Sequence, residues 1–343
     1  MINLLDLNQN EIHNLLDDKP YRSSQVFQWI YKKAITDINQ MTNIAKNMRT
    51  KLAEKATIVY PELIERQVSE DTTEKYAYRL NDGNVIESVL IPDKDHWTIC
   101  VSSQVGCSLG CKFCYTGRMG FVRNLMPSEI IAQVLYPMRA FPQKNIRNVV
   151  FMGMGEPLLN YDSVVRAVQI ITDVKGPGIS TRRVTVSSCG IIPGLKTLWR
   201  DTHAALAISL NAPTDQQRSA IMPINTKYPL NDLLGVLREY PLPRRRRITM
   251  EYVLLKGVND SLEDARNLVR VLSGIKAKIN LIPFNQWPGA PFQTPDKASV
   301  EAFEAYLKSS PLTVMMRREK GQDILAACGQ LAGGRVNEQS RTC

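Results

Sequence analysis

Three closely spaced cysteines are the residues of this chain whose types and spacing point most directly to chemistry. Cys107, Cys111 and Cys114 lie in the run Gly-Cys-Ser-Leu-Gly-Cys-Lys-Phe-Cys, with three residues between the first pair and two between the second. One short loop can therefore wrap three thiolates around one face of a cubic iron–sulfur cluster. A self-sufficient [4Fe–4S] site takes four cysteines. Three cysteines leave one iron atom free to bind another molecule.

A structural zinc loop is the alternative for these thiols. Structural zinc takes four Cys or His ligands, and the chain has three histidines, His13, His96 and His203. His96 is the nearest to the loop, but a strand expected at residues 98–105 would carry it to the far end of that strand. These positions favour iron–sulfur chemistry and leave zinc as the weaker alternative.

Composition indicates the cellular compartment of the protein and the size of the hydrophobic core that it can form. The chain has 343 residues, of which 44% are hydrophobic and seven are cysteines. This length suits one large domain and a smaller one. No stretch approaches the ~18 apolar residues of a membrane span, and no secretory segment opens the chain. We therefore expect a cytoplasmic protein with reduced thiols and no membrane association.

The charge balance predicts an anionic partner. Lys and Arg number 43 against 33 Asp and Glu, which gives a net charge of +10. RNA is the first candidate for such a surplus, although the same charge spread evenly would only confer solubility. The four arginines at 244–247 form a local concentration that either contacts RNA or is a solvated turn.

Hydrophobic periodicity predicts a small N-terminal domain before a larger α/β domain. Residues 1–60 have helical periodicity, with one helix at 41–56, and residues 75–80 and 85–91 alternate as a hairpin. From residue 98, strands and helices alternate, which predicts a parallel sheet, either doubly wound or a partial TIM barrel. The expected strands are 98–105, 149–152, 183–187, 204–210, 248–255, 278–283 and 312–316, and the expected helices are 128–138, 161–172, 262–272 and 295–308.

A second loop favours the barrel. The run Gly153-Met154-Gly155-Glu156-Pro157 follows the strand expected at 149–152, and the cysteine loop also follows a strand. In a (β/α) barrel, active groups gather at the C-terminal ends of the strands. The two glycines can expose backbone to a ligand beside the carboxylate.

Together these loops resemble a known enzyme family. With Phe113 before the last cysteine, the first loop resembles the signature of radical S-adenosylmethionine (SAM) enzymes, in which SAM chelates the open iron, and the Gly-Glu loop resembles their second motif. The match becomes specific to the RlmN/Cfr family of radical SAM RNA methyltransferases through the runs 100–107, 153–160, 222–225 and 326–331. The resemblance extends from about residue 22 to residue 333.

The resemblance implies a fold of class α/β. It is a partial (β/α)6 TIM-like radical SAM barrel behind a small N-terminal α+β domain. The implied division is an RNA-binding accessory domain at 1–85, the barrel at 86–325, and a catalytic loop and tail at 326–343.

The resemblance also implies site residues. The cluster ligands would be Cys107, Cys111 and Cys114. Glu87 would accept a proton, Cys328 would become S-methylated, and Cys100 would be the resolving cysteine. An ordinary strand carboxylate and small buried hydrophobes are the alternatives for these three. The SAM contacts would be Gly155, Glu156, Ser187, Ser209, Leu210, Asn211 and Asn285.

A few positions depart from the family pattern or distinguish its branches. Asn211 stands where His is common, and Cys189 where another small residue is usual. We treat Cys189 and Cys343 as incidental. Pro157 after Gly-Glu favours methylation of adenine C2 over the C8 methylation of the Cfr branch.

The implied mechanism uses two SAM molecules per turnover. The first methylates the Cys328 thiolate, and the second is split reductively to a 5′-deoxyadenosyl radical that removes hydrogen from that methyl group. The carbon radical adds to adenine C2, and Cys100 then releases Cys328 through a disulfide. The implied substrates are 23S rRNA near the peptidyl-transferase centre and tRNA beside the anticodon. The electrons would come from a flavodoxin- or ferredoxin-type donor, and the enzyme would act as a monomer.

Three competing hypotheses stay open. The first is a C8 methyltransferase conferring antibiotic resistance. The second is a radical SAM enzyme acting on a peptide or small molecule, against which the basic N-terminal segment and Cys328 argue. The third is an RNA-binding protein with a structural metal loop, which iron and sulfide analysis would identify.

Overall fold

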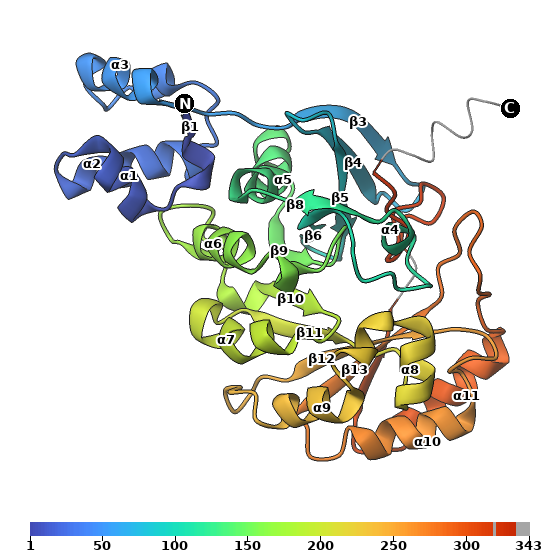
Figure 1. The fold of residues 1–343 in the computed structure, drawn as a ribbon. Helices are drawn as coiled ribbons and strands as arrows, with labels where there is room; N and C mark the ends of the chain where they lie inside the picture. The colour runs from blue at the N-terminus through green and yellow to red at the C-terminus, as the bar shows by residue number, and fades with distance from the viewer. Residues whose placement is uncertain (318–319, 334–343) are drawn as a thin grey trace, which may run out of the picture.

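A ten-stranded sheet organises the chain in the computed structural model, which describes residues 1–317 and 320–333 (Figure 1). Its strand order is β14-β13-β12-β11-β10-β9-β6-β5-β4-β3. Every neighbouring pair from β6 to β14 is parallel, and the pairs from β3 to β6 are antiparallel. None of the helices in these described residues has the length and hydrophobicity of a membrane span.

The parallel strands form the predicted partial barrel. They are β6 (Trp97–Cys100), β9 (Ile146–Phe151), β10 (Val184–Ser188), β11 (Ala205–Ser209), β12 (Ile248–Leu254), β13 (Ala277–Pro283) and β14 (Thr313–Met316). The helices between them are α5 (Pro127–Ala140), α6 (Tyr161–Thr172), α7 (Ile192–Thr202), α8 (Asp215–Ile221), α9 (Leu230–Arg238), α10 (Leu262–Val271) and α11 (Lys297–Lys308). The sequence analysis found α5, α6, α10 and α11, and missed α7, α8 and α9.

Alternation along the strands divides the core from the barrel interior. In β12, Ile248, Met250, Tyr252 and Leu254 are fully buried, and Tyr252 stacks on Phe303 of α11. Successive side chains on a strand point to opposite faces, so the residues between them point into the barrel. The same alternation holds in β10 and β11, and it decides which polar residues reach the site.

The predicted hairpin is part of the barrel's sheet. Strands β3 (Glu62–Val68), β4 (Glu74–Arg79) and β5 (Val85–Pro92) form an antiparallel extension, and β5 pairs with β6 with Val89 opposite Cys100. The sequence analysis did not predict β3. The division at residue 85 stays a prediction, but the hydrogen bonds join residues 62–92 to the large domain.

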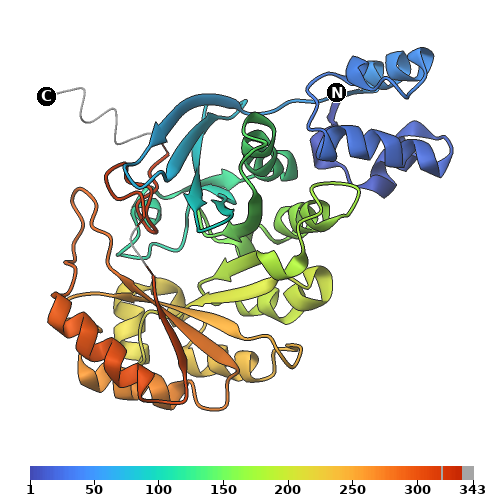
Figure 2. The same cartoon turned by 180° about the vertical axis from the view of Figure 1, so that it is seen from behind.

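The N-terminal helices stand to one side of the sheet (Figures 1 and 2). Helices α1 (Gln9–Leu16), α2 (Pro20–Phe27) and α3 (Lys46–Lys55) pack with short turns η1 (Leu4–Asp6), η2 (Gln28–Lys32) and η3 (Ile38–Gln40), and a two-residue pair joins β1 (Ile2–Asn3) to β2 (Ala56–Thr57). The helix expected at 41–56 begins only at Lys46, because Ala45 before it is extended. Arg166 of α6 holds this domain by donating to the Asp6 carbonyl and to Glu11.

The single strand expected at 98–105 is wrong. β6 ends at Cys100, and β7 (Gln104–Gly106) pairs with β8 (Phe121–Asn124) in a separate two-stranded sheet. The chain leaves the large sheet at 102 and 103, where the Ser102 amide donates to the Gln133 side chain at 2.8 Å and the Ser103 amide donates to the Met154 carbonyl at 2.8 Å. This break aims the cysteine loop across the barrel mouth, and α4 (Tyr115–Arg118) follows it.

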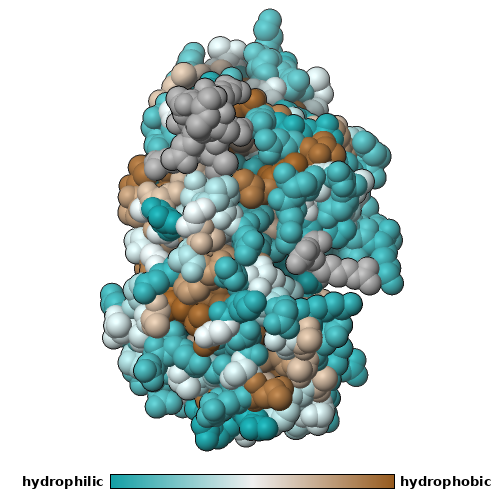
Figure 3. All heavy atoms as spheres, turned by 90° about the vertical axis from the view of Figure 1, so that its right-hand side faces the viewer, coloured by the Kyte–Doolittle hydropathy of each residue, from teal (hydrophilic) through white to brown (hydrophobic). Residues whose placement is uncertain are grey.

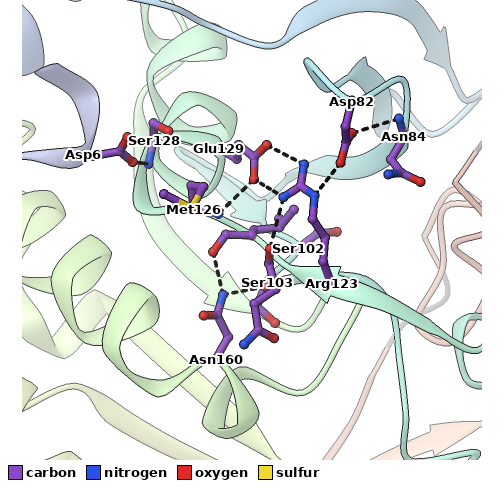
Figure 4. Close-up of polar contacts among 12 residues, drawn as sticks. Asp6, Asp82, Asn84, Ser102, Ser103, Arg123, Met126, Ser128, Glu129 and Asn160 are labelled. Atoms are coloured by element: carbon purple, nitrogen blue, oxygen red, sulfur yellow. Dashed lines mark hydrogen bonds and ion pairs between the residues drawn. The ribbon is translucent and has the colours of Figure 1, made fainter. Parts of the chain in front are cut away.

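Arg123 of β8 fixes this break to the hairpin and to α5 (Figure 4). Its guanidinium donates to Asp82 in the hairpin turn at 2.5 Å and to both oxygens of Glu129 at 2.7 and 2.8 Å. Asn160 donates to the carbonyls of Ser103 and Leu125, both at 2.8 Å. The bonds from Arg123 to Glu129 are charge-assisted and partly buried, and such bonds fix geometry more firmly than exposed pairs do.

We predict that Arg123→Met lowers the free energy of unfolding by about 1–3 kcal/mol, since it removes hydrogen bonds to two carboxylates. Arg123 holds the pKa of Asp82 well below its usual range. The stability that the Arg123–Asp82 bond contributes is therefore present above the ordinary Asp pKa of about 4, and it is lost as pH falls through the lower pKa of the folded state. Chemical denaturation against pH measures this. Arg79→Met, which removes an exposed pair with Glu62, is the control and should cost at most about 1 kcal/mol.

Candidate active site

The cysteine loop folds over the C-terminal ends of the parallel strands. The Cys107 amide donates to the Gly120 carbonyl at 2.9 Å, and the Lys112 amide donates to the Ile221 carbonyl at 2.9 Å. Gly106 has φ +70°, and a Cβ there would meet the Gly120 oxygen, so this turn requires glycine. The loop is thus tied to β8 on one side and to the end of α8 on the other.

The three thiols line one pocket, here called the cluster pocket. Its cavity volume is about 140 Å³. Its lining includes Cys107, Cys111, Cys114, Glu156 and Ser187. The residues expected to hold the cluster are therefore together.

The donor set fits an iron–sulfur cluster. Burial raises the pKa of the Cys107 and Cys114 thiols, so a cationic centre is needed to hold them as thiolates. Among the residues described, no three His, Cys, Asp or Glu side chains converge on a point that could hold a single metal ion. The thiolates of a cluster bind separate iron atoms and need not converge. His96, with Asp93 and Asp95, lies at the far end of β6, as predicted.

Most of the expected SAM contacts line the same pocket. They are Gly155, Glu156, Ser187, Ser209, Asn211 and Asn285. Leu210 does not line it and is fully buried, because it alternates with Ser209 and Asn211 and faces the helices. The Leu210 amide and carbonyl bond Glu251 and Arg218, so its role in the structure is to hold β11.

The Gly-Glu loop is shaped by packing. A Cβ on Gly155 would lie 2.5 Å from the Gln104 Cβ, and one on Gly153 would lie 2.8 Å from the Ser102 Oγ. The Glu156 carboxylate accepts from the amides of Leu158 at 3.1 Å and Cys189 at 2.8 Å, and burial raises its pKa. The glycines therefore allow this loop to approach Ser102 and the first residue of β7, and Glu156 ties it to the end of β10.

Cys100 and Cys328 line an adjoining pocket, here called the thiol pocket, with Arg317 and Asn285. Burial raises the pKa of Cys100 to about 12 and also raises the pKa of Cys328. The Arg317 guanidinium opposes that rise at both thiols. The structure thus brings together two cysteines that are 228 positions apart in the sequence. Cys114, Asn285, Arg317 and Cys328 line both pockets.

The sequence analysis missed two charged residues of the site. Glu251 and Arg317 line the cluster pocket. Asn280 donates to both Glu251 oxygens at 3.1 and 3.0 Å, burial raises the Glu251 pKa, and Arg317 lowers it. Glu251 is a charged residue within the largely apolar strand β12, at a position that faces the barrel interior. A charged residue at such a position is the sequence signal from which it could have been predicted. Arg317 follows directly on β14.

Cys189, treated as incidental, lines the cluster pocket beside Cys111. Cys343 lies outside the described residues. Strand parity puts Cys189 on the same face as Ser187 at the end of β10.

Glu87 fixes the segment that carries Cys328. This segment, residues 326–333, is here called the C-terminal strap, and Figure 1 shows it beside α4. One Glu87 oxygen accepts from the amides of Ala332 at 2.8 Å and Gly333 at 3.1 Å, and the other lies 3.6 Å from the Lys75 Nζ. Thr116 also donates to the Leu331 carbonyl at 2.7 Å. Glu87 is buried beneath the strap and does not line either pocket.

Known proteins share both the sequence and this arrangement. Residues 2–58 match the family model of the ribosomal RNA large subunit methyltransferase N-terminal domain, and residues 101–269 match that of the radical SAM superfamily. The dual-specificity RNA methyltransferase RlmN of Syntrophus aciditrophicus is 46% identical over 98% of this chain and 98% of its own, and that of Geobacter sulfurreducens is 49% identical over 97% and 92%. The chain belongs to the RlmN family of radical SAM methyltransferases.

A solved structure agrees with the fold. A radical SAM methyltransferase from Sphaerobacter thermophilus superposes with a TM-score of 0.92 at 39% identity, covering 97% of this chain and all of that one. The predicted radical SAM barrel and the N-terminal domain are therefore confirmed. The two matched family models leave Glu87, Cys100 and Cys328 outside their ranges, so the roles of these three stay predictions.

We predict that Glu87→Ala releases the strap. The Ala332 and Gly333 amides lose the carboxylate that accepts their hydrogen bonds, and each such bond stabilises the bound strap by about 1.5–3 kcal/mol. Iodoacetamide should then alkylate Cys328 in anaerobic protein at least ten times faster. Peptide mass spectrometry at successive times measures this rate. Glu87→Gln, which keeps an acceptor oxygen, should change the rate less. Glu62→Ala, on the exposed end of β3, is the control. An unchanged rate in Glu87→Ala would show that other contacts hold the strap.

Proposed function

We propose that this RlmN-family protein methylates C2 of adenosine in 23S rRNA and in tRNA next to the anticodon. The relatives are named for dual specificity toward RNA. The observation that carries the proposal is that two free cysteines, Cys100 and Cys328, line one pocket. This thiol pocket shares Cys114 and Asn285 with the cluster pocket. A radical SAM enzyme without a cysteine-bound methyl group has no need of this second pair of thiols.

The chemistry of adenine explains why thiols are required. C2 is electron-poor and is no nucleophile, so it cannot take a methyl group directly from the sulfonium of SAM. When bound, the [4Fe–4S] cluster and SAM supply a radical, and we propose that two SAM molecules are used per turnover. Cys107, Cys111 and Cys114 would hold the cluster.

The two cysteines of the thiol pocket have different tasks. Cys328 would carry the methyl group to the adenine, and Cys100 would then form a disulfide with it to release the product. Burial raises both thiol pKa values, and Arg317 opposes the rise at each. We propose that Arg317 supports the thiolate of Cys328 when that sulfur accepts a methyl group, and the thiolate of Cys100 when it attacks the Cys328 sulfur and breaks the bond from that sulfur to the methyl carbon.

Glu87 is the proposed proton acceptor for the C2 hydrogen. Its carboxylate is engaged by two strap amides and by Lys75. We propose that this carboxylate accepts the proton once RNA displaces the strap. Its two amide contacts lie on the strap, the segment that also carries Cys328.

The C8 alternative is not favoured. The curated relatives bear the RlmN name, and Pro157 begins a short turn (Pro157–Leu159) directly after Glu156, in which Pro157 and Leu158 are buried.

RNA is proposed to contact the N-terminal domain first. Among the described residues, none of its candidate cations forms an ion pair within 4.0 Å; they are Lys19, Arg22, Lys32, Lys33, Lys46, Arg49, Lys51 and Lys55. The face in Figure 3, on the side of the C-terminal strap, is mostly hydrophilic with small separate apolar patches.

We further propose a cytoplasmic monomer that takes electrons from a flavodoxin- or ferredoxin-type donor.

Nucleoside mass spectrometry tests the function. RNA from cells lacking the gene should gain 2-methyladenosine in both rRNA and tRNA when the wild-type protein is supplied, but not with Cys328→Ala. Cys100→Ala should instead accumulate a protein–RNA cross-link through Cys328. Chromatographic standards distinguish 2-methyl- from 8-methyladenosine. Full methylation by Cys328→Ala would end the covalent proposal, and an 8-methyl product would revive the Cfr alternative.

Salt dependence locates the RNA footprint. The triple variant Lys19→Gln, Lys32→Gln and Lys51→Gln should flatten the log–log salt slope of RNA binding by about two to three units, roughly 0.7–0.9 for each phosphate that a lysine no longer neutralises. Arg244→Gln with Arg245→Gln is the comparison, since these exposed arginines lie at the N-terminal end of β12, away from the site. A change confined to the second variant would move the footprint to the barrel's opposite end.

A further inference from the structure

Lys75 is a nearly buried cation to which the proposed function gives no task. It lies on β4, and its side chain is 12% exposed, against 5% for that of Glu87. Its Nζ lies 3.6 Å from the Glu87 Oε1. In the part of the chain that the structure describes, Lys75 forms no other ion pair within 4.0 Å. Lysine is seldom buried without a partner, so the contact with Glu87 accounts for its place.

The strand holds Lys75 on the face of the sheet that the strap covers. In the pairing of β4 with β5, Ala77 lies opposite Glu87, and Lys75 lies opposite Val89. Side chains two positions apart on a strand share a face, so Lys75 and Ala77 lie on the same face as Glu87. The Gly333 amide, at the end of the strap, donates to Glu87 on this face.

The other face of β4 is anchored in the core. Tyr76 and Tyr78 are fully buried there, and both rings pack edge to face against Tyr136 of α5, at 5.8 and 6.0 Å between ring centroids. Aromatic pairs of this geometry add to the stability gained from burial. The backbone of Lys75 is therefore fixed to the core of the large domain.

The two Glu87 oxygens have different partners. The amides of Ala332 and Gly333 donate to Oε2 and belong to the strap, whereas Lys75 lies beside Oε1 and belongs to the sheet. The proposed function has RNA displace the strap, which removes both amide donors. Oε2 is then free, and Oε1 keeps its cation. A buried carboxylate without any partner is costly, so the remaining contact decides how the carboxylate is held.

We propose that Lys75 is a positioning residue that holds Glu87 by Oε1 while the strap is displaced, so that Oε2 can take the proton from adenine C2. This inference rests on the proposed function, in which Glu87 is the proton acceptor. In that step the proton moves from C2 to Oε2, and the electron pair of the C–H bond stays on the adenosine adduct. Lys75 keeps its own protons and acts through its charge.

The alternative is that Lys75 binds an RNA phosphate directly. The observations favour the positioning role, because the Nζ is paired with Glu87 and the side chain is nearly buried. The two roles differ in what they change. Loss of a phosphate contact weakens RNA binding, whereas loss of positioning slows removal of the C2 proton.

The test is single-turnover methylation by anaerobic protein with its cluster and SAM, on a 23S rRNA transcript whose adenosines carry hydrogen or deuterium at C2. Lys75→Met should slow formation of 2-methyladenosine about tenfold or more, since it removes part of the roughly 10²–10⁴-fold that a positioned base contributes. Its deuterium isotope effect should exceed that of wild type, because proton removal then limits the rate. Lys75→Arg, which keeps the cation, should lose less activity.

Arg79→Met is the matched control. Arg79 lies on the same face of β4, but its partner Glu62 is exposed, so the rate and the isotope effect should equal those of wild type. Thermal unfolding, RNA affinity and reductive SAM cleavage with dithionite are measured for every variant. Lys75→Gln, which is neutral but polar, provides the same comparison if Lys75→Met does not fold.

Three outcomes would overturn the proposal. A wild-type rate in folded Lys75→Met would show that Glu87 does not need Lys75. A slower rate with an unchanged isotope effect and slower SAM cleavage would reduce Lys75 to a support of the fold. Weaker RNA binding with an unchanged isotope effect would assign Lys75 to a phosphate. Wild-type protein that forms no 2-methyladenosine, or full activity in Glu87→Gln, would instead contradict the proposed function, which keeps the two failures distinct.

Discussion

The alternation of side chains on the parallel strands is the constraint on which the site depends. In β12, four apolar residues of one parity are buried against the helices, and Glu251 of the other parity lines the cluster pocket. The same rule sends Leu210 to the core while Ser209 and Asn211 reach the pocket. A shift of one residue in the register of any strand would turn its core side chains into the pocket and its pocket side chains into the core. The packing that stabilises the barrel therefore also decides which residues line the pocket.

Several buried polar groups near the thiols are held by hydrogen bonds. Glu156 accepts two amides, Arg218 is surrounded by carbonyls, and Glu251 accepts from Asn280. An unpaired polar group at such depth would cost several kcal/mol. The pairing makes these groups rigid, and in a water-poor pocket each charge acts strongly on its neighbours. Arg317 and the thiols of Cys100 and Cys328 are coupled for this reason.

The hairpin connects the N-terminal half of the chain to the C-terminal strap. Ser69 donates to Asp323 at 2.5 Å, the Gly321 amide donates to Asp71 at 3.1 Å, and Glu87 accepts from the end of the strap. Residues from β3 to β5 thus position Cys328 although they are distant from it in the sequence. Because the hairpin belongs to the barrel's sheet, this support is rigid with respect to the cluster pocket, as the proposed role of Cys328 requires.

The sequence by itself determined the cysteine loop, the Gly-Glu loop, most of the parallel strands and the family. These features depend on short spacings and local periodicity, which can be recognised in the amino-acid sequence alone. Only the tertiary structure decided the break after Cys100, the removal of Leu210 from the pocket, and the place of Cys189 in the lining of the cluster pocket. It also decided the approach of Arg317 to Cys328 and the bonds from Glu87 to the strap. Each of these contacts joins different strands or loops, and their meeting follows from sheet order and parity, which no local pattern encodes.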